Sequence, residues 1–251
     1  MKKLFFLCGL PRSGSTWINT ILNQNPDIFV TPQSPLVELL WRQYSLWSEC
    51  GTAEDFASDA VIEMKIPYLK KMVKLYYEHL TDSPIIIDNK RGWQNLGNIE
   101  MFVEIFGERP KIICPVRNME EIAASFTAIF QKHNRVWDTD QMKDVLMDNR
   151  QQLKTTYESE YRDCLHFVEY EDLVEDTESV LKGMYDFIEE PYFNHVLEEM
   201  NPDKSYLRVA SIYKLPTLHK VNSGVVKSKT RTDEFLSDSQ MFRYSSLSFW
   251  K

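Results

Sequence analysis

Short, uninterrupted apolar runs alternate along the chain with longer stretches in which apolar residues recur every three or four positions. A short apolar run is typical of a strand buried on both faces, whereas the longer pattern is typical of an amphipathic helix. The predicted strands cover residues 5–8, 28–30, 85–88, 111–116 and 164–168. The predicted helices begin near Trp17 and continue with residues 35–48, 61–80 with a break before Pro67, 99–106, a segment capped by Asn118 with Glu121, 138–157 and 173–188.

Strands that alternate with helices in this way predict an α/β fold, in which a P-loop-type parallel sheet is covered by helices on both faces. The chain has no internal repeat, low-complexity tract or long linker. We therefore expect residues 1–251 to form a single domain, whose pattern fades into an irregular tail with short helices from about residue 201. Ligands of such sheets bind at the carboxyl ends of the strands, so the residues that follow each strand are the first candidates for a site.

The charge balance narrows the possible partners. The 251 residues carry a net charge of −8, which argues against a general affinity for nucleic acid or for an anionic membrane.

No apolar segment is long enough to span a bilayer, and the run after Met1 is interpreted as the first core strand rather than a signal peptide. Cys8 and Cys114 lie in apolar strands and are expected to be buried thiols, which fits a reducing, cytoplasmic setting. The sequence indicates neither a partner protein nor an oligomeric state.

The segment between the first strand and the first helix has the spacing of a phosphate-binding loop. Four residues separate Gly9 from Gly14, as in the pattern G-x-x-x-x-G-K-[ST] of nucleotide-binding P-loops. Ser15 takes the place of the lysine that reaches the outer phosphates, and Arg12 supplies a cation inside the loop instead. Because the backbone N–H groups at the start of a helix attract anions, the loop is predicted to bind a phosphate-like group, although not as a standard NTPase does.

Basic residues follow three of four strands, although the chain as a whole is acidic. The four strand ends carry Arg12, Asp88–Arg91, Arg117 and Glu169–Asp172. Cations gathered at one edge of a sheet repel one another unless an anion joins them. The arrangement therefore favours a bound polyanion.

Residues Pro11–Trp17 resemble the loop that binds the 5′-phosphosulfate of 3′-phosphoadenosine 5′-phosphosulfate (PAPS) in sulfotransferases. The arginine version of this loop is most similar to tyrosylprotein sulfotransferases and related bacterial proteins. The resemblance implies a sulfotransferase-like fold and transfer of a sulfonate from PAPS to an acceptor hydroxyl or amine, without a metal. The co-substrate contacts that it implies in the loop are Pro11, Arg12, Ser13, Gly14, Ser15, Thr16 and Trp17. For Trp17, stacking on adenine and packing in the helix face are both open.

Residues later in the chain are similar to the same family. Arg117 and Ser125 are eight residues apart, like the arginine and serine that hold the 3′-phosphate in sulfotransferases. Helical geometry allows this spacing, because positions 118, 121 or 122 and 125 share one stripe of a helix. The segment Tyr170–Leu173 resembles one that meets the co-substrate, and Lys227 resembles a late lysine at the 3′-phosphate.

The resemblance also implies catalytic roles. Asn89-Lys90 is similar to an Asn-Lys pair whose lysine contacts the transferring sulfonate, so Lys90 and Arg12 are expected to stabilise the charge that builds during transfer. A hydroxyl acceptor also needs a general base. The glutamate of the tyrosylprotein branch falls here at Gln33, which cannot take a proton, and Glu38 is the nearest carboxylate.

Three alternatives remain open from the sequence. His133 and Asp88 are weaker candidates for the base than Glu38. The chain is alternatively a P-loop nucleotide or small-molecule kinase, which the serine at position 15 argues against. It is alternatively a non-catalytic PAPS-binding relative, which Gln33 favours. The sequence does not define the class of the acceptor.

Overall fold

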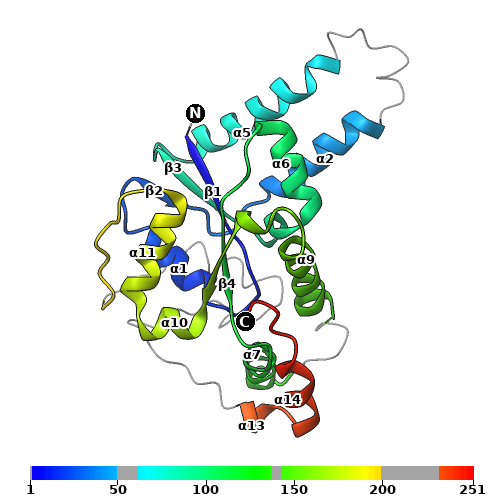
Figure 1. The fold of residues 1–251 in the computed structure, drawn as a ribbon, viewed down its shortest axis with the longest axis vertical. Helices are drawn as coiled ribbons and strands as arrows, with labels where there is room; N and C mark the ends of the chain where they lie inside the picture. The colour runs from blue at the N-terminus through cyan, green and yellow to red at the C-terminus, as the bar shows by residue number, and fades with distance from the viewer. Residues whose placement is uncertain (1, 50–61, 137–142, 199–231) are drawn as a thin grey trace.

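The computed structural model describes residues 2–49, 62–136, 143–198 and 232–251 (Figure 1). Its centre is a parallel sheet of five strands in the order β2-β3-β1-β4-β5. The strands are β1 (Lys3–Leu7), β2 (Ile28–Val30), β3 (Ile85–Asn89), β4 (Ile112–Val116) and β5 (Leu165–Glu169). The expected α/β fold with a parallel sheet is confirmed.

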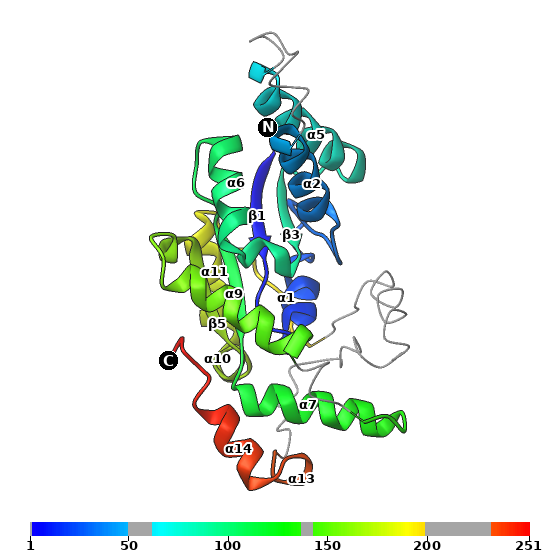
Figure 2. The ribbon, with the colours of Figure 1, turned by 90° about the vertical axis from the view of Figure 1, so that its right-hand side faces the viewer.

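Helices cover both faces of the sheet. The described helices are α1 (Ser15–Leu22), α2 (Leu36–Glu49), α5 (Lys65–Leu80), α6 (Leu96–Phe106), α7 (Met119–Lys132), α9 (Asp148–Tyr157), α10 (Tyr170–Glu175), α11 (Thr177–Ile188), α13 (Thr232–Phe235) and α14 (Asp238–Ser245), with 3₁₀ turns at Arg91–Gln94 and Arg162–Cys164 and a π-helical turn at Lys143–Met147. In Figure 1, α1 and α11 lie on one side of β4, and α6 and α9 lie on the other. Figure 2 shows the same arrangement after a quarter turn.

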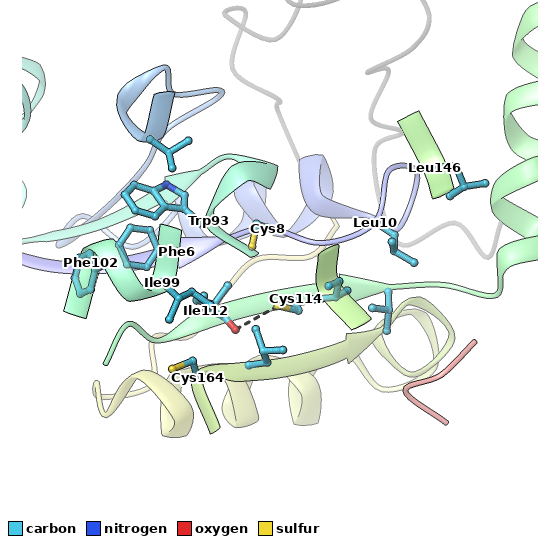
Figure 3. Close-up of a cluster of buried hydrophobic side chains, with 14 of the residues drawn as sticks. Phe6, Cys8, Leu10, Trp93, Ile99, Phe102, Ile112, Cys114, Leu146 and Cys164 are labelled. Atoms are coloured by element: carbon cyan, nitrogen blue, oxygen red, sulfur yellow. Dashed lines mark hydrogen bonds between the residues drawn. The ribbon is translucent and has the colours of Figure 1, made fainter. Parts of the chain in front are cut away.

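The two faces of the sheet have separate cores, because successive side chains of a strand point to opposite faces. Phe5 and Leu7 of β1 pack in a cluster with residues of α1 and α11. Phe6 packs in the other cluster, against Trp93 and Phe102, with ring centroids 4.2 and 5.2 Å away (Figure 3). Strands buried on both faces explain why their sequences read as uninterrupted apolar runs.

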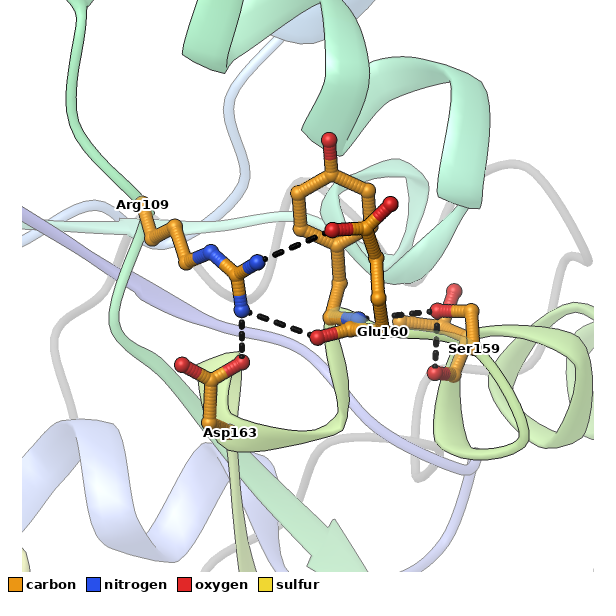
Figure 4. Close-up of polar contacts among 6 residues, drawn as sticks. Arg109, Ser159, Glu160 and Asp163 are labelled. Carbon is orange, nitrogen blue, oxygen red and sulfur yellow. Dashed lines mark hydrogen bonds and ion pairs between the residues drawn. The ribbon is translucent and has the colours of Figure 1, made fainter.

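The register of the strands brings their carboxyl ends to one edge. Leu7 pairs with both Asn89 and Ile113, and Val116 pairs with Glu169. The residues that follow β1, β3, β4 and β5 therefore lie along a single edge, as the sequence predicted. At the opposite edge, where the strands begin, Arg109 precedes β4. It forms ion pairs with two residues that precede β5, Glu160 at 3.1 Å and Asp163 at 2.6 Å (Figure 4).

Several helix boundaries differ from the predicted ones because side chains cap the helices at other residues. The helix expected over 173–188 is two helices, because Asp176 caps α11 by accepting a hydrogen bond from the Ser179 N–H. In the same way Asn95 caps α6, which begins before the expected residue 99. Asn118 is the N-cap residue of α7, as expected, but its side chain makes no capping bond, and Glu121 binds Arg117 instead of completing a capping box.

Other expectations are met where the structure describes the chain. The break before Pro67 is present, and α5 begins at Lys65. Within the predicted tail, residues 199–231 lie outside the described residues, while α13 and α14 are short helices that pack against α7. Cys8 and Cys114 are buried free thiols, as is Cys164 (Figure 3). Among the helices of the described segments, none combines the length and apolar content that a bilayer crossing requires.

Candidate functional site

The loop between β1 and α1 is held in a conformation that few side chains tolerate. Arg12 has φ 62° and Gly14 has φ 94°, and Gly14 is the N-cap residue of α1. Ser13 is buried, and its hydroxyl donates to the Leu10 carbonyl. Two positive φ values, separated only by Ser13, turn the loop over the N-terminus of α1, where backbone N–H groups attract an anion.

The loop also packs closely against its neighbours. A Cβ atom at Gly9 would lie 2.2 Å from the Pro115 carbonyl oxygen of β4, and one at Gly14 would lie 3.2 Å from the Tyr170 ring. The Leu10 N–H donates to the same Pro115 oxygen at 3.1 Å. The two glycines are therefore required by close approach, and they fix the loop against β4 and the start of α10.

Arg12 and Arg117 converge on one face of α7. Arg12 Nε donates to Ser125 Oγ at 3.2 Å, and Arg117 Nε donates to Glu121 Oε2 at 2.7 Å. The Arg117 guanidinium lies over the Tyr170 ring, with Cζ 4.2 Å from the ring centroid. Burial, with the charge of Arg117 as the next cause, lowers the pKa of Arg12 to about 10. The edge thus concentrates positive charge where the sequence predicted a polyanion.

Lys90 follows β3 at the same edge. Its N–H donates to the Leu7 carbonyl at 3.1 Å, which ties it to the end of β1. Its ammonium lies 2.8 Å from Glu38 Oε1 in the first turn of α2, and the Glu38 side chain is 51% exposed. The structure therefore brings together the lysine and the carboxylate that were candidates for catalysis.

A family model described as "Sulfotransferase family" matches residues 5–194. The chain belongs to the sulfotransferase family. No curated protein sequence matches the chain.

Solved structures of sulfotransferases share the fold. The sulfotransferase domain from the curacin biosynthetic pathway has a TM-score of 0.63 and 18% identity, covering 98% of this chain and 97% of the domain. The sulfotransferase domain from the Synechococcus PCC 7002 olefin synthase has a TM-score of 0.55 and 15% identity, covering 97% of this chain and 96% of the domain. Mouse sulfotransferase SULT7A1, solved in complex with 3′,5′-adenosine bisphosphate (PAP), has a TM-score of 0.50 and 15% identity, covering 98% of this chain and 83% of its own. The expected fold is therefore confirmed, and the family model confirms the expected family.

The two weaker candidates for the general base, Asp88 and His133, do not lie beside Lys90 in this sulfotransferase. Asp88 is fully buried, and its carboxylate accepts hydrogen bonds from Tyr77 at 2.7 Å and Trp93 at 2.6 Å. Burial raises the pKa of Asp88, and its contacts with Tyr77 and Trp93 give it a structural role at the end of β3. His133 is the C-cap residue of α7, about 20 Å along the helix from its start. Glu38 is thus the carboxylate that the fold brings to Lys90.

Trp17 and Lys227 were also predicted to contact the co-substrate. Trp17 is half-buried and packs against the core beside α1, in keeping with the packing alternative. Lys227 lies outside the described residues. The sequence analysis missed the contact of Glu121 with Arg117, although a carboxylate four residues after an arginine is a recognisable helical pair.

Proposed function

We propose that this sulfotransferase transfers the sulfonate group of PAPS to an acceptor hydroxyl or amine and releases PAP. PAPS supplies the activated sulfonate. The observation that carries the proposal is the single edge at which the glycine loop, two arginines and the Lys90–Glu38 pair meet. The loop, whose packing on β4 no Cβ at Gly9 would allow, leads into the N-terminus of α1, where backbone N–H groups attract an anion such as a phosphosulfate.

The resemblance to the family suggests the nucleotide contacts, and the contacts among these residues support them. The loop N–H groups of residues 13–16 and Arg12 hold the 5′-phosphosulfate, while Arg117 and Ser125 hold the 3′-phosphate. The hydrogen bond between Arg12 and Ser125 supports this assignment, because it places the two anion contacts next to each other. Tyr170 supports it as well, since its ring lies against both Gly14 and Arg117.

Glu38 is proposed as the general base. As the acceptor oxygen or nitrogen bonds to sulfur, the bond from sulfur to the phosphate oxygen breaks, and the acceptor proton moves to Glu38. Lys90 and Arg12 stabilise the negative charge on the sulfonate and the leaving phosphate. The separation of 2.8 Å between Lys90 Nζ and Glu38 Oε1 supports a shared site for proton and sulfonate. No contact among the described residues favours a kinase, and Glu38 beside Lys90 supplies the carboxylate that Gln33 does not.

The experiment that tests this function measures PAP release from PAPS with a panel of phenols, alcohols and amines. Glu38→Gln is expected to lower turnover with the best acceptor by about 10²–10⁴, which is the usual cost of removing a general base. It should also remove the acidic limb of the pH–rate profile and leave PAP affinity unchanged. Glu78→Gln is the matched control, because Glu78 is equally exposed, at 50%, and pairs with Lys74 away from the site. An unchanged turnover in Glu38→Gln would exclude Glu38 as the base.

We further propose that the reaction takes place in the cytoplasm. The described thiols Cys8, Cys114 and Cys164 are all free, which fits a reducing compartment. We also treat residues 1–251 as one domain, which the packing of α14 against α7 supports.

A further inference from the structure

Each arginine of the nucleotide site is held by an acceptor on the same face of α7. Ser125 Oγ accepts from Arg12 Nε, and Glu121 Oε2 accepts from Arg117 Nε. Glu121 and Ser125 are four residues apart, so they lie one above the other on one stripe of the helix. α7, which only Arg117 and Asn118 separate from the end of β4, thus presents one acceptor per turn to the two guanidinium groups.

Two contacts with described residues orient the guanidinium plane of Arg117. Glu121 binds its Nε edge at 2.7 Å, and the Tyr170 ring lies under it at 4.2 Å from Cζ. The Arg117 side chain is 5% exposed, so water does not offer an alternative arrangement. A guanidinium is a rigid planar fork, and the orientation of its plane decides which donors a phosphate meets.

The Glu121 carboxylate also lies beside one of two cations whose charges interact. Two neighbouring cations repel each other, and the effect of Arg117 on Arg12 is part of what lowers the pKa of Arg12 to about 10. The Glu121 carboxylate, 25% exposed, balances one of the two charges before any anion is bound.

We propose that Glu121 is a positioning residue for recognition of the 3′-phosphate. It acts through Arg117, whose guanidinium plane it fixes, and it thereby lets the site distinguish adenine nucleotides with a 3′-phosphate from those without one. This inference rests on the proposed function, in which Arg117 binds the 3′-phosphate. The role differs from the helix cap that the sequence predicted for the same residue.

The experiment compares the affinities of PAP and AMP by calorimetry, in the wild-type protein and in three variants of Glu121. The ratio of the two affinities isolates the 3′-phosphate. Glu121→Ala removes the contact, and Glu121→Asp keeps the charge but withdraws it by one methylene. Both are expected to lower the ratio about tenfold or more, the usual effect of losing a charge-assisted contact. Glu121→Gln keeps an oxygen that accepts from Nε and should retain the ratio within about threefold. If the alanine variant does not fold, the aspartate and glutamine variants carry the test.

Glu158→Ala is the matched control, since Lys154 and Glu158 form a pair of the same spacing and order, 3.3 Å apart, on α9. It should leave both affinities unchanged. An unchanged ratio in the alanine and aspartate variants would overturn the inference, as would an equal loss of PAP and AMP binding. A glutamine variant as poor as the alanine variant would overturn it too, because charge rather than orientation would then be responsible. If the wild type itself bound PAP no better than AMP, the proposed function would fail instead.

Discussion

Gly9→Ala tests whether the loop depends on its close contact with β4. The added Cβ would lie 2.2 Å from the Pro115 carbonyl oxygen and 2.9 Å from the Pro115 nitrogen. A carbon and a carbonyl oxygen approach no closer than about 3.3 Å, so the two segments must separate by about 1 Å. Overpacking of this kind costs about 1–3 kcal/mol. Loss of the hydrogen bond from the Leu10 N–H to the same oxygen adds about 1 kcal/mol.

The expected loss of unfolding free energy is therefore about 2–4 kcal/mol, or roughly 4–16 °C in Tm for a chain of this size. Thermal unfolding with and without PAP measures it, and PAP should no longer stabilise the variant fully. Gly183→Ala is the control in which the added methyl group fits, because its Cβ would meet nothing closer than His166 at 3.9 Å. Gly107→Ala is the control for backbone strain, because its φ is +77° and nothing lies within 4 Å. A Gly9→Ala protein with wild-type Tm and PAP affinity would refute the reasoning.

Two further predictions concern the arginine site and the pH dependence of stability. Arg117→Ala should weaken PAP binding at least about tenfold and leave adenosine 5′-phosphosulfate nearly unaffected, because a charge-assisted phosphate contact contributes about 1.5–3 kcal/mol. Calorimetry with both ligands checks this, and equal losses would exclude Arg117 as the 3′-phosphate contact. Burial lowers the pKa of His166 from 6.5, so its contribution to stability is present above pH 6.5 and is lost as the pH falls through the lower folded-state pKa. His166→Phe should therefore flatten the fall in unfolding free energy below about pH 6.5, by up to about 1.4 kcal/mol per pH unit. Denaturant titrations in which the unfolding free energy of the variant depends on pH as that of the wild type does would contradict this prediction.

The core of the fold was predictable because each strand is buried on both faces. Residues 85–87 and 112–116 contain no charged side chain and are buried on both faces, so their pattern favours core strands. The order of the strands in the sheet depends on contacts between distant segments, which periodicity does not record. The division between α10 and α11 was missed because the apolar period continues across Asp176, whose side chain nevertheless begins a new helix.

The candidate site was predictable where it follows from short spacings. Gly9 to Gly14 and Arg117 to Ser125 are local patterns, and the fold brings both to one edge. The pairing of Glu38 with Lys90 depends on tertiary packing, since Val37 lies against Gly92 and thereby places the start of α2 beside the end of β3. From the sequence, the Glu121 carboxylate could accept either from a backbone N–H at the start of α7 or from an arginine. In the structure it pairs with Arg117, because a buried guanidinium needs a partner of opposite charge.

Comparison of PAP with ATP·Mg²⁺ tests the central claim most directly, which is that the edge binds the nucleotide of a PAPS-dependent sulfotransferase. The measurement is the Tm of the intact chain with each ligand at equal concentration, together with the dissociation constants. PAP at 100 times its dissociation constant should add about 2.7 kcal/mol to the unfolding free energy. ATP·Mg²⁺ should add much less, because Ser15 stands where a kinase has its lysine. Equal shifts for the two ligands, or a larger shift with ATP·Mg²⁺, would contradict the account.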